Sequence, residues 1–160
     1  MREIVTNTSP LLYLHQLGCI QLLGEMYGTV IVPQGVVGEL EVGRAAGHDV
    51  PQVTDLSWAT VVSSPNVALL ALATDLGRGE SEAIAIAHER GGLLILDDGL
   101  ARRHATLIGV EITGTLGVLL KAKTERHVSR VAPLAAKLTE LGFHLSEQTR
   151  QSVLKLAGES

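Results

Sequence analysis

Short runs of aliphatic residues alternate along the chain with longer segments in which apolar residues recur every three or four positions. The short runs are typical of strands buried on both faces of a sheet, and the longer segments are typical of helices with one apolar face. Strands that alternate with helices favour a parallel sheet covered by helices on both sides. The predicted fold class is therefore α/β, a three-layer α/β/α sandwich around a central parallel sheet of about four or five strands.

The predicted elements follow from these runs and from the glycines and prolines between them. Strands are expected at Glu3–Thr6, Thr29–Val32, Ala59–Val62, Leu93–Leu96 and Val110–Thr113. Helices are expected between Pro10 and Gly18, at Ile20–Tyr27, from Pro33 onward, and at Val67–Leu76, Glu80–Arg90, Ala101–Ile108 and Thr115–Lys123, with a loop at Gly77–Gly79. Proline suits a first helical turn, and glycine commonly ends a helix.

The last third of the chain predicts two further helices. Val131, Leu134, Leu138 and Leu141 are spaced by three, four and three residues, which is one face of a helix. Ser146 is a suitable cap for a final helix. We therefore expect a single domain over residues 1–160, with C-terminal helices from about residue 127 packed on it.

Composition and charge narrow the class of protein. Hydrophobic residues make up 46% of the chain and aromatic residues only 2%, so the core must be aliphatic. The net charge is −4, whereas proteins that coat phosphate backbones are usually basic, so a nucleic acid would have to be bound locally. A single cysteine, Cys19, fits a reducing compartment. No membrane span or signal-peptide core is visible, and we expect a cytoplasmic protein.

Two adjacent carboxylates, Asp97 and Asp98, follow the aliphatic run Leu93–Leu96 and precede a segment of helical composition. Open α/β sheets bind their ligands at the carboxyl ends of strands. Neighbouring acids repel each other unless a cation lies between them, and a divalent cation is the usual partner. The alternative is an Asp-Gly turn in which one aspartate caps the next helix.

Three glutamates and one asparagine occupy comparable positions. Glu80 and Glu82 lie in the first turn of a predicted helix, Glu39 lies one turn into another, and Asn7 ends the first strand. Acids in a first turn are also favoured by the helix dipole, and Glu39 can equally be a solvated surface residue. If these positions meet around one pocket, their oxygens would hold Mg²⁺ or Mn²⁺, and a metal-bound water could attack a phosphodiester. Asn7 supplies no charge, which predicts weaker metal binding.

Five segments, taken in order, resemble the PIN-domain superfamily, in particular the PIN-like branch that begins with a (D/N)TSP signature. They are IVTNTSPLLYL at 4–14, IVPQGVVGEL at 31–40, GRGESEAIAIA at 77–87, LLILDDGLARRHA at 93–105 and GTLGVLLKAK at 114–123. The segment 141–159 is similar to the C-terminal helix of that branch. The resemblance covers nearly the whole chain.

This resemblance implies an α/β/α sandwich with a Mg²⁺- or Mn²⁺-dependent ribonuclease site for single-stranded RNA or tRNA. Many PIN proteins are VapC-type toxins that form homodimers and pair with an antitoxin protein. Carried over by position, the catalytic residues are Asn7, Glu39, Glu82 or Glu80, and Asp98 with its neighbour Asp97. The metal ligands are Asn7, Glu82, Asp98 and Asp97, and the substrate-binding residues are Thr8, Ser9, Arg102 and Arg103. The two arginines can also simply form a solvated helix face.

The leading interpretation is a metal-dependent endoribonuclease, the toxin of a toxin–antitoxin pair. One alternative is a PIN-like domain, catalytically weak because of Asn7, that binds RNA or a protein without cutting. Another is a small α/β interaction or regulatory protein with a vestigial pocket. The apolar faces predicted over residues 11–23 and 131–157 also favour a homodimer.

Overall fold

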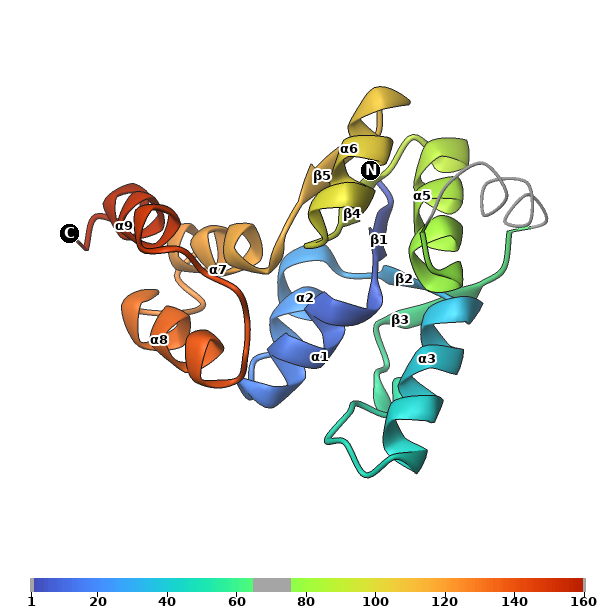
Figure 1. The fold of residues 1–160 in the computed structure, drawn as a ribbon, viewed down its shortest axis with the longest axis horizontal. Coiled ribbons are helices and arrows are strands. Elements are labelled where there is room, and N and C mark those ends of the chain that lie inside the picture. The colour runs from blue at the N-terminus through green and yellow to red at the C-terminus, as the bar shows by residue number, and fades with distance from the viewer. Residues whose placement is uncertain (1, 65–75, 160) are drawn as a thin grey trace.

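The computed structural model describes residues 2–64 and 76–159 of the chain. Within these ranges, five strands form one parallel sheet in the order β3-β2-β1-β4-β5. Helices cover both faces of the sheet (Figure 1). The three-layer α/β/α fold predicted from the hydrophobic pattern is confirmed.

The strands are short, and each is followed by at least one helix or turn of helix. The strands are β1 (Ile4–Thr6), β2 (Val30–Pro33), β3 (Ala59–Val62), β4 (Leu93–Ile95) and β5 (Glu111–Thr113). The helices are α1 (Thr8–Gln16), α2 (Gln21–Tyr27), α3 (Gln34–Ala45), η1 (Val53–Asp55, a 3₁₀ turn), α5 (Arg78–Arg90), α6 (Gly99–Leu107), α7 (Thr115–Thr124), α8 (Ala132–Glu140) and α9 (Glu147–Leu156). None of the helices in the described ranges is long and apolar enough to cross a membrane.

Alternating strand residues supply two aliphatic cores, one on each face of the sheet. The first core joins Ile4, Val30 and Ile95 to α1, α2, α3 and α7. The second joins Val5 and neighbouring strand residues to α5 and α6. Both cores are almost entirely aliphatic, as the composition predicts, and together they fix where each strand ends.

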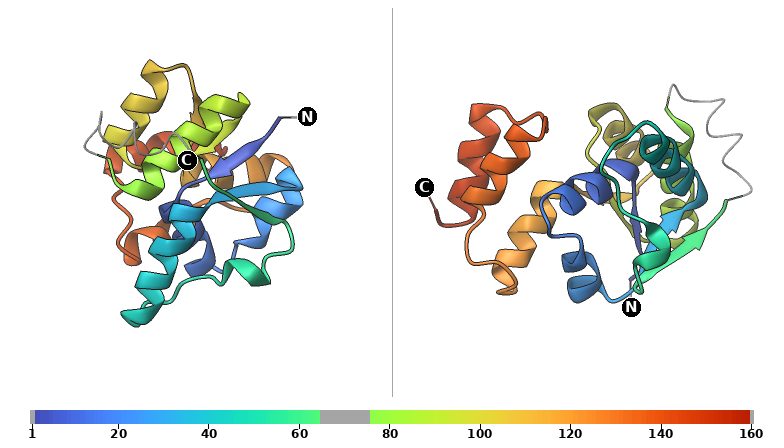
Figure 2. Two further views of the ribbon diagram at one scale, coloured as in Figure 1. Left: turned by 90° about the vertical axis from the view of Figure 1, so that its right-hand side faces the viewer. Right: turned by 90° about the horizontal axis from the view of Figure 1, so that it is seen from below.

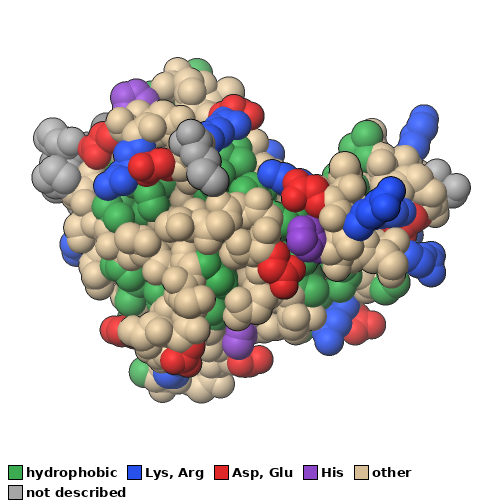
Figure 3. Space-filling model, turned by 180° about the vertical axis from the view of Figure 1, so that it is seen from behind, with side chains coloured by type: hydrophobic (Ala, Val, Ile, Leu, Met, Phe, Trp, Pro, Cys, Tyr) green, Lys and Arg blue, Asp and Glu red, His purple; other side chains and the backbone are tan. Residues whose placement is uncertain are grey.

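The C-terminal helices α8 and α9 lie beside the α/β part, next to α7 (Figure 2). The Glu159 carboxylate fastens them, because it accepts hydrogen bonds from Lys123 Nζ at 2.8 Å, Val131 N at 2.7 Å and Ala132 N at 2.9 Å. Lysine and arginine side chains are prominent on their surface (Figure 3). Residues 115–160 carry seven lysines and arginines against four acids, so the negative net charge resides in residues 1–114.

Three predicted elements differ from the structure or fall outside it. Helix α5 begins at Arg78, so the loop predicted at Gly77–Gly79 is wrong beyond its first residue. Helix α6 begins at Gly99, two residues earlier than predicted, because the Asp98 carboxylate caps it. The helix predicted at Val67–Leu76 lies, apart from its last residue, outside the described residues.

Candidate functional site

The strand order changes direction between β1 and β4. From β1 the chain continues to β2 and β3 on one side, and β4 and β5 lie on the other side. Open α/β sheets form a ligand-binding crevice outside the carboxyl ends of their strands at such a switch point. Asn7 directly follows β1, and Asp97 and Asp98 follow β4. The predicted site residues of both strands therefore lie at this crevice.

Asn7 is held at the end of β4 and carries a buried polar atom without a partner. Its backbone N–H donates to Ile95 O at 3.0 Å. The Asn7 residue is only 3% exposed, and its side-chain oxygen Oδ1 accepts no hydrogen bond from the described residues. Leaving a buried acceptor unsatisfied costs about 1–3 kcal/mol unless a water or ligand satisfies it. Asn7 Oδ1 is thus an acceptor suited to a ligand.

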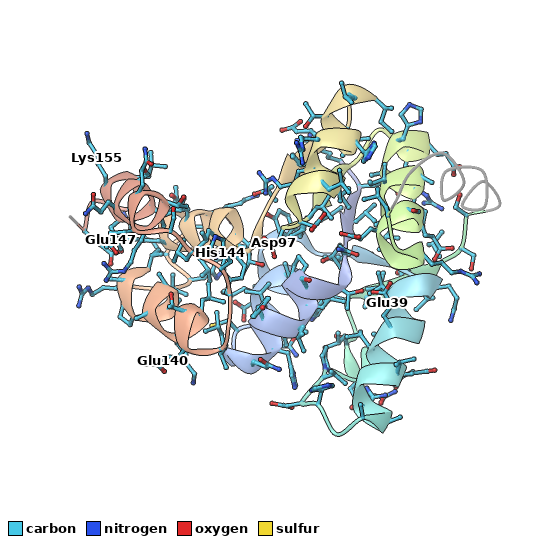
Figure 4. The ribbon with its side chains drawn as sticks, viewed as in Figure 1. Glu39, Asp97, Glu140, His144, Glu147 and Lys155 are labelled. Atoms are coloured by element: carbon cyan, nitrogen blue, oxygen red, sulfur yellow. The ribbon has the colours of Figure 1, made fainter. Side chains whose placement is uncertain are left out.

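Glu39 connects the first turns of α1 and α5. Thr8 Oγ1 donates to Glu39 Oε2 at 2.5 Å, and Gly79 N donates to Glu39 Oε1 at 3.0 Å. Figure 4 shows Glu39 at the place where α1, α3 and α5 meet. The two donors fix the orientation of this carboxylate. Ser9 lies next to Thr8, half-buried in the first turn of α1.

Glu80 lies close to Glu39 and Asp98. A methyl group on Gly77 would lie 3.8 Å from Glu80 Oε1 and 4.0 Å from Glu39 Oε1. Burial raises the pKa of Glu80, and the negative charges of Asp98 and then Glu39 raise this pKa further, against a hydrogen bond from the Gly77 backbone that lowers it. Three acidic side chains therefore converge, and one of them, Glu39, accepts a hydrogen bond from Thr8, the residue that follows Asn7.

The adjacent aspartates have different partners. Asp98 Oδ2 accepts a hydrogen bond from Ala101 N at 2.9 Å and caps α6, which is the alternative that the sequence left open. Asp97 accepts from Thr115 N at 2.8 Å and from Thr115 Oγ1 at 2.6 Å, which anchors the start of α7. Burial raises the pKa of Asp97, and the Thr115 hydrogen bonds and Arg102 oppose this rise. Of the two aspartates, Asp98 is the one whose charge raises the pKa of Glu80.

Glu82 has both carboxylate oxygens engaged by backbone amides. Gly35 N donates to Glu82 Oε1 at 2.6 Å and Ser64 N donates to Oε2 at 3.4 Å, and Glu82 is 2% exposed. Glu82 thus ties α5 to the start of α3 and to the residues after β3. Of the two glutamates that the sequence could not separate, Glu80 is the one that borders the acid cluster.

The two arginines of α6 also differ from each other. Arg102 Nη1 donates to Leu96 O at 2.9 Å and lies near Asp97, so this side chain supports the turn after β4. Arg103 is exposed and lines a shallow hollow with Thr106, Leu107 and Ile112. Neither guanidinium is seen to enter the acid cluster.

A hollow next to Glu39 was not predicted from the sequence. Its volume is about 570 Å³, and its lining consists of Gln34, Gly35, Gly38, Glu39, Val42 and Arg78. Gly35 and Gly38, spaced by three residues, leave a gap without side chains on this face of α3, between Gln34, Glu39 and Val42. That spacing is the sequence signal that could have pointed to the hollow.

The donors present suit a hard cation that keeps part of its water shell. Within residues 2–64 and 76–159, no three histidine, cysteine or carboxylate side chains form a ready cage for a metal ion. Mg²⁺ is usually bound by one or two carboxylates together with waters and substrate phosphates, rather than by such a cage. Glu80, Asp98 and the unpartnered Asn7 Oδ1 form a donor set of that open kind.

Comparison with known families covers nearly the whole chain. Residues 3–159 match the family model DUF3368, which is described as a PIN domain. No curated protein and no solved structure matches the chain. The parallel sheet, its switch point and the acids gathered there agree with a fold of nuclease type. The chain therefore belongs to the DUF3368 family of PIN domains.

Proposed function

We propose that the chain is a metal-dependent endoribonuclease of PIN type. The observation that carries this proposal is the convergence of Glu39, Glu80 and Asp98. Thr8 joins Glu39 to the end of β1, where the unpartnered Asn7 Oδ1 lies. Burial raises the pKa of Glu80, and the negative charges of Asp98 and then Glu39 raise it further. A divalent cation would relieve this repulsion, and phosphodiester hydrolysis is chemistry that such sites support.

The surroundings of each side chain indicate which role it would have in the site. Glu80, Asp98 and Asn7 Oδ1 would hold Mg²⁺ or Mn²⁺. When bound, the metal supplies Lewis acidity and lowers the pKa of a coordinated water. Asp98 uses only Oδ2 for its helix cap, so its other oxygen is available to a ligand. Glu39, fixed by Thr8 and Gly79, keeps its charge directed at the site.

Cleavage of fluorescent single-stranded RNA in Mn²⁺, with and without EDTA, tests this function. We expect cleavage that EDTA stops and that Asp98→Asn slows by roughly 100-fold or more, the loss typical of removing one group that stabilises developing charge. Glu140→Gln, a change on the exposed surface of α8, is the matched control and should leave the rate unchanged. Cleavage that persists in EDTA, or that Asp98→Asn leaves intact, would refute the proposal.

A second candidate function is binding without cleavage. Asn7 favours it, because an amide at this position gives the site one negative charge fewer than a carboxylate would, and cation affinity depends on ligand charge. RNA binding that is retained in EDTA, together with no cleavage in Mn²⁺ or Mg²⁺, would favour this candidate.

The partners proposed here rest on the resemblance to VapC-type toxins. They are an antitoxin protein, a second copy of the chain as a homodimer, and single-stranded RNA or tRNA in the cytoplasm. For the toxin role, expression of the chain should arrest cell growth, and co-expression of a small reading frame directly upstream of the gene should relieve the arrest. Growth that is unaffected by the chain would exclude the toxin role without affecting the nuclease proposal.

A further inference from the structure

We propose that the hollow beside Glu39 binds one unstacked nucleobase of a single-stranded nucleic acid, next to the phosphate presented to the acid cluster. This proposal rests on the proposed function and adds a base-recognition site to it. Glu39 belongs to both places, because its carboxylate meets Thr8 and Gly79 at the acid cluster and also lines the hollow. A nucleotide bound next to Glu39 would place its base in the hollow and its phosphate at the acid cluster.

The floor of the hollow is bare helix backbone. A Cβ atom on Gly38 would meet no atom within 4 Å, so this position faces open space. Gly35 is fixed below it by the hydrogen bond from its N–H to Glu82. A planar base can lie closely against such a surface. Val42, which is 72% exposed, offers apolar contact at the far end of the hollow.

The rim carries groups that recognise nucleotides. The Gln34 side chain presents both a donor and an acceptor, the pattern that pairs with the hydrogen-bonding edge of a base. Arg78 lines the same hollow and forms no ion pair with the described residues. An arginine side chain of this kind can stack on a base or bind a phosphate. Sequence-specific recognition of single-stranded RNA uses this combination of stacking and edge contacts.

The dimensions and lining favour a nucleotide over a protein segment. A hollow of about 570 Å³ lies in the range of small-molecule sites. A helix docked in a groove needs several apolar anchors at helical spacing, and among the described residues the lining offers Val42 as its one large exposed apolar side chain. The other lining residues are two glycines and the polar or charged residues Gln34, Glu39 and Arg78.

The test is a binding measurement in EDTA, where metal-dependent cleavage does not interfere. The four nucleoside 5′-monophosphates are titrated by NMR, and single-stranded RNA homopolymers by fluorescence anisotropy. Gly38→Leu fills the hollow, and Gly38→Ala does so partially. Gly43→Ala, in the same helix but outside the hollow, is the control, because its added Cβ would meet only Val50 Cγ1 at 3.4 Å. Thermal unfolding of each variant verifies that it is folded.

The wild-type chain should prefer one or two of the four bases. Gly38→Leu should weaken binding of the preferred nucleotide about tenfold or more, the loss expected when one stacked base is displaced. Gly38→Ala should give a smaller loss of the same kind, and Gly43→Ala should give none. Gln34→Ala should make the affinities for the four nucleotides more nearly equal. Arg78→Ala should weaken the binding of all four nucleotides by a similar factor.

The results separate this proposal from the nuclease proposal. If no nucleotide binds, or if folded Gly38→Leu and Gly38→Ala bind like the wild type, the hollow is not a base site, even if the chain cleaves RNA. If the base preference responds to Gly38 and Gln34 as expected but no metal-dependent cleavage occurs, the base site stands and the nuclease proposal fails.

Discussion

Position 7 carries an amide at the point where the acid cluster faces the end of β1. Asn7→Asp adds one negative charge at nearly the same volume, beside Glu39, Glu80 and Asp98. Because cation affinity depends on ligand charge, this change should tighten Mn²⁺ binding and raise any RNase activity. Calorimetric Mn²⁺ titration and the RNA cleavage assay measure both effects. If neither quantity changes, Asn7 is not a metal ligand, and binding without cleavage becomes the better interpretation.

The charged Glu80 carboxylate lowers the stability of the fold without metal, although it would help to bind a metal ion. Its raised pKa means that the charged carboxylate is less favourable in the folded chain than in the unfolded one, mainly because of burial and Asp98. This penalty is absent below the unfolded pKa of about 4.5 and is complete once the pH exceeds the raised folded pKa. Glu80→Gln should therefore raise the Tm at pH 7 without metal, by up to about 4 °C.

The same substitution should weaken Mn²⁺ binding, because it removes a charged oxygen ligand. Differential scanning fluorimetry at pH 7 and at pH 4, together with a Mn²⁺ titration, measures both effects. The gain in Tm should shrink at pH 4, where the wild-type Glu80 is largely protonated. A loss of Tm at pH 7, or an unchanged Mn²⁺ affinity, would contradict this assignment of Glu80.

At the scale of single residues, the sequence predicts which acids lie near the strand ends but not how their contacts differ. Glu80 lies in the first turn of α5 and Glu82 lies just after that turn, and residues two apart point to roughly opposite sides of a helix. Glu82 is buried and accepts a hydrogen bond from Gly35, which lies 47 residues earlier in the chain. No local sequence pattern reveals a contact over this separation. Asp97 is likewise committed to Thr115, 18 residues later.

The crossing of α3 and α5 positions Glu39 and explains an error in the predicted elements. The glycine pattern predicts a loop at Gly79, but this residue lies in the first turn of α5, where a Cβ atom would come within 2.5 Å of Glu39 Oε1 and 3.0 Å of Oε2. Glycine is favoured here because the Glu39 carboxylate approaches its Cα closely, and not because a helix ends at this residue. The inner strands β1, β2 and β4, by contrast, were predictable because each is a short, largely buried aliphatic run. The edge strands β3 and β5 are more exposed, and β-branched residues rather than burial mark them in the sequence.

Gly79→Ala should disturb this crossing. The added methyl group forces the Glu39 carboxylate away from Gly79 N, and losing this hydrogen bond costs about 0.5–1.5 kcal/mol. The Tm should fall by roughly 1–5 °C, and Mn²⁺ binding should weaken with it. Gly38→Ala is the matched control, because its Cβ meets no atom within 4 Å and alanine favours helix, so its Tm should stay equal or rise. Equal Tm values for the two variants would contradict the close-approach argument.

At the scale of the whole molecule, the apolar helix faces expected to form a dimer are mostly used within the chain. Leu11, Leu14 and Leu23 of α1 and α2 are fully buried in the first core, and Val131 joins them there. The sequence could not show this, because an apolar face looks the same whether it packs on its own sheet or on a second copy. A dimer interface therefore has to be sought on surface that the single chain leaves exposed.

Helix α6 offers such a surface, with Leu107 83% exposed and Ile108 43% exposed. If the proposed homodimer forms through this face, Leu107→Glu should convert it to a monomer, because the substitution places a charge in the apolar contact. Sedimentation velocity at micromolar concentration measures the change. Leu156→Glu, at the exposed end of α9, is the control and should leave the dimer intact. A wild-type monomer would remove the dimer proposal.

The C-terminal helices are attached to the α/β part by a carboxylate, which makes their attachment dependent on pH. The Glu159 side chain is 5% exposed, and Lys123 together with the Val131 and Ala132 amides lowers its pKa to about 2. A lowered carboxyl pKa stabilises the fold fully above the unfolded pKa of about 4.5, and this stabilisation is lost as the pH falls towards about 2.

Glu159→Gln should therefore lower the Tm at pH 7 by about 2–6 °C, in line with the loss of a helix-capping group. The amide keeps one acceptor oxygen but directs its NH₂ group at amide or ammonium donors. The difference from the wild type should narrow as the pH falls below about 5 and should vanish only below about pH 2, where the folded carboxyl is protonated as well. Glu147→Gln in α9, whose carboxylate is exposed and 3.7 Å from Arg150, should show almost no such dependence. Thermal unfolding followed by circular dichroism across this range measures both variants, and a constant difference for Glu159→Gln would show that the carboxylate charge does not hold the C-terminal helices.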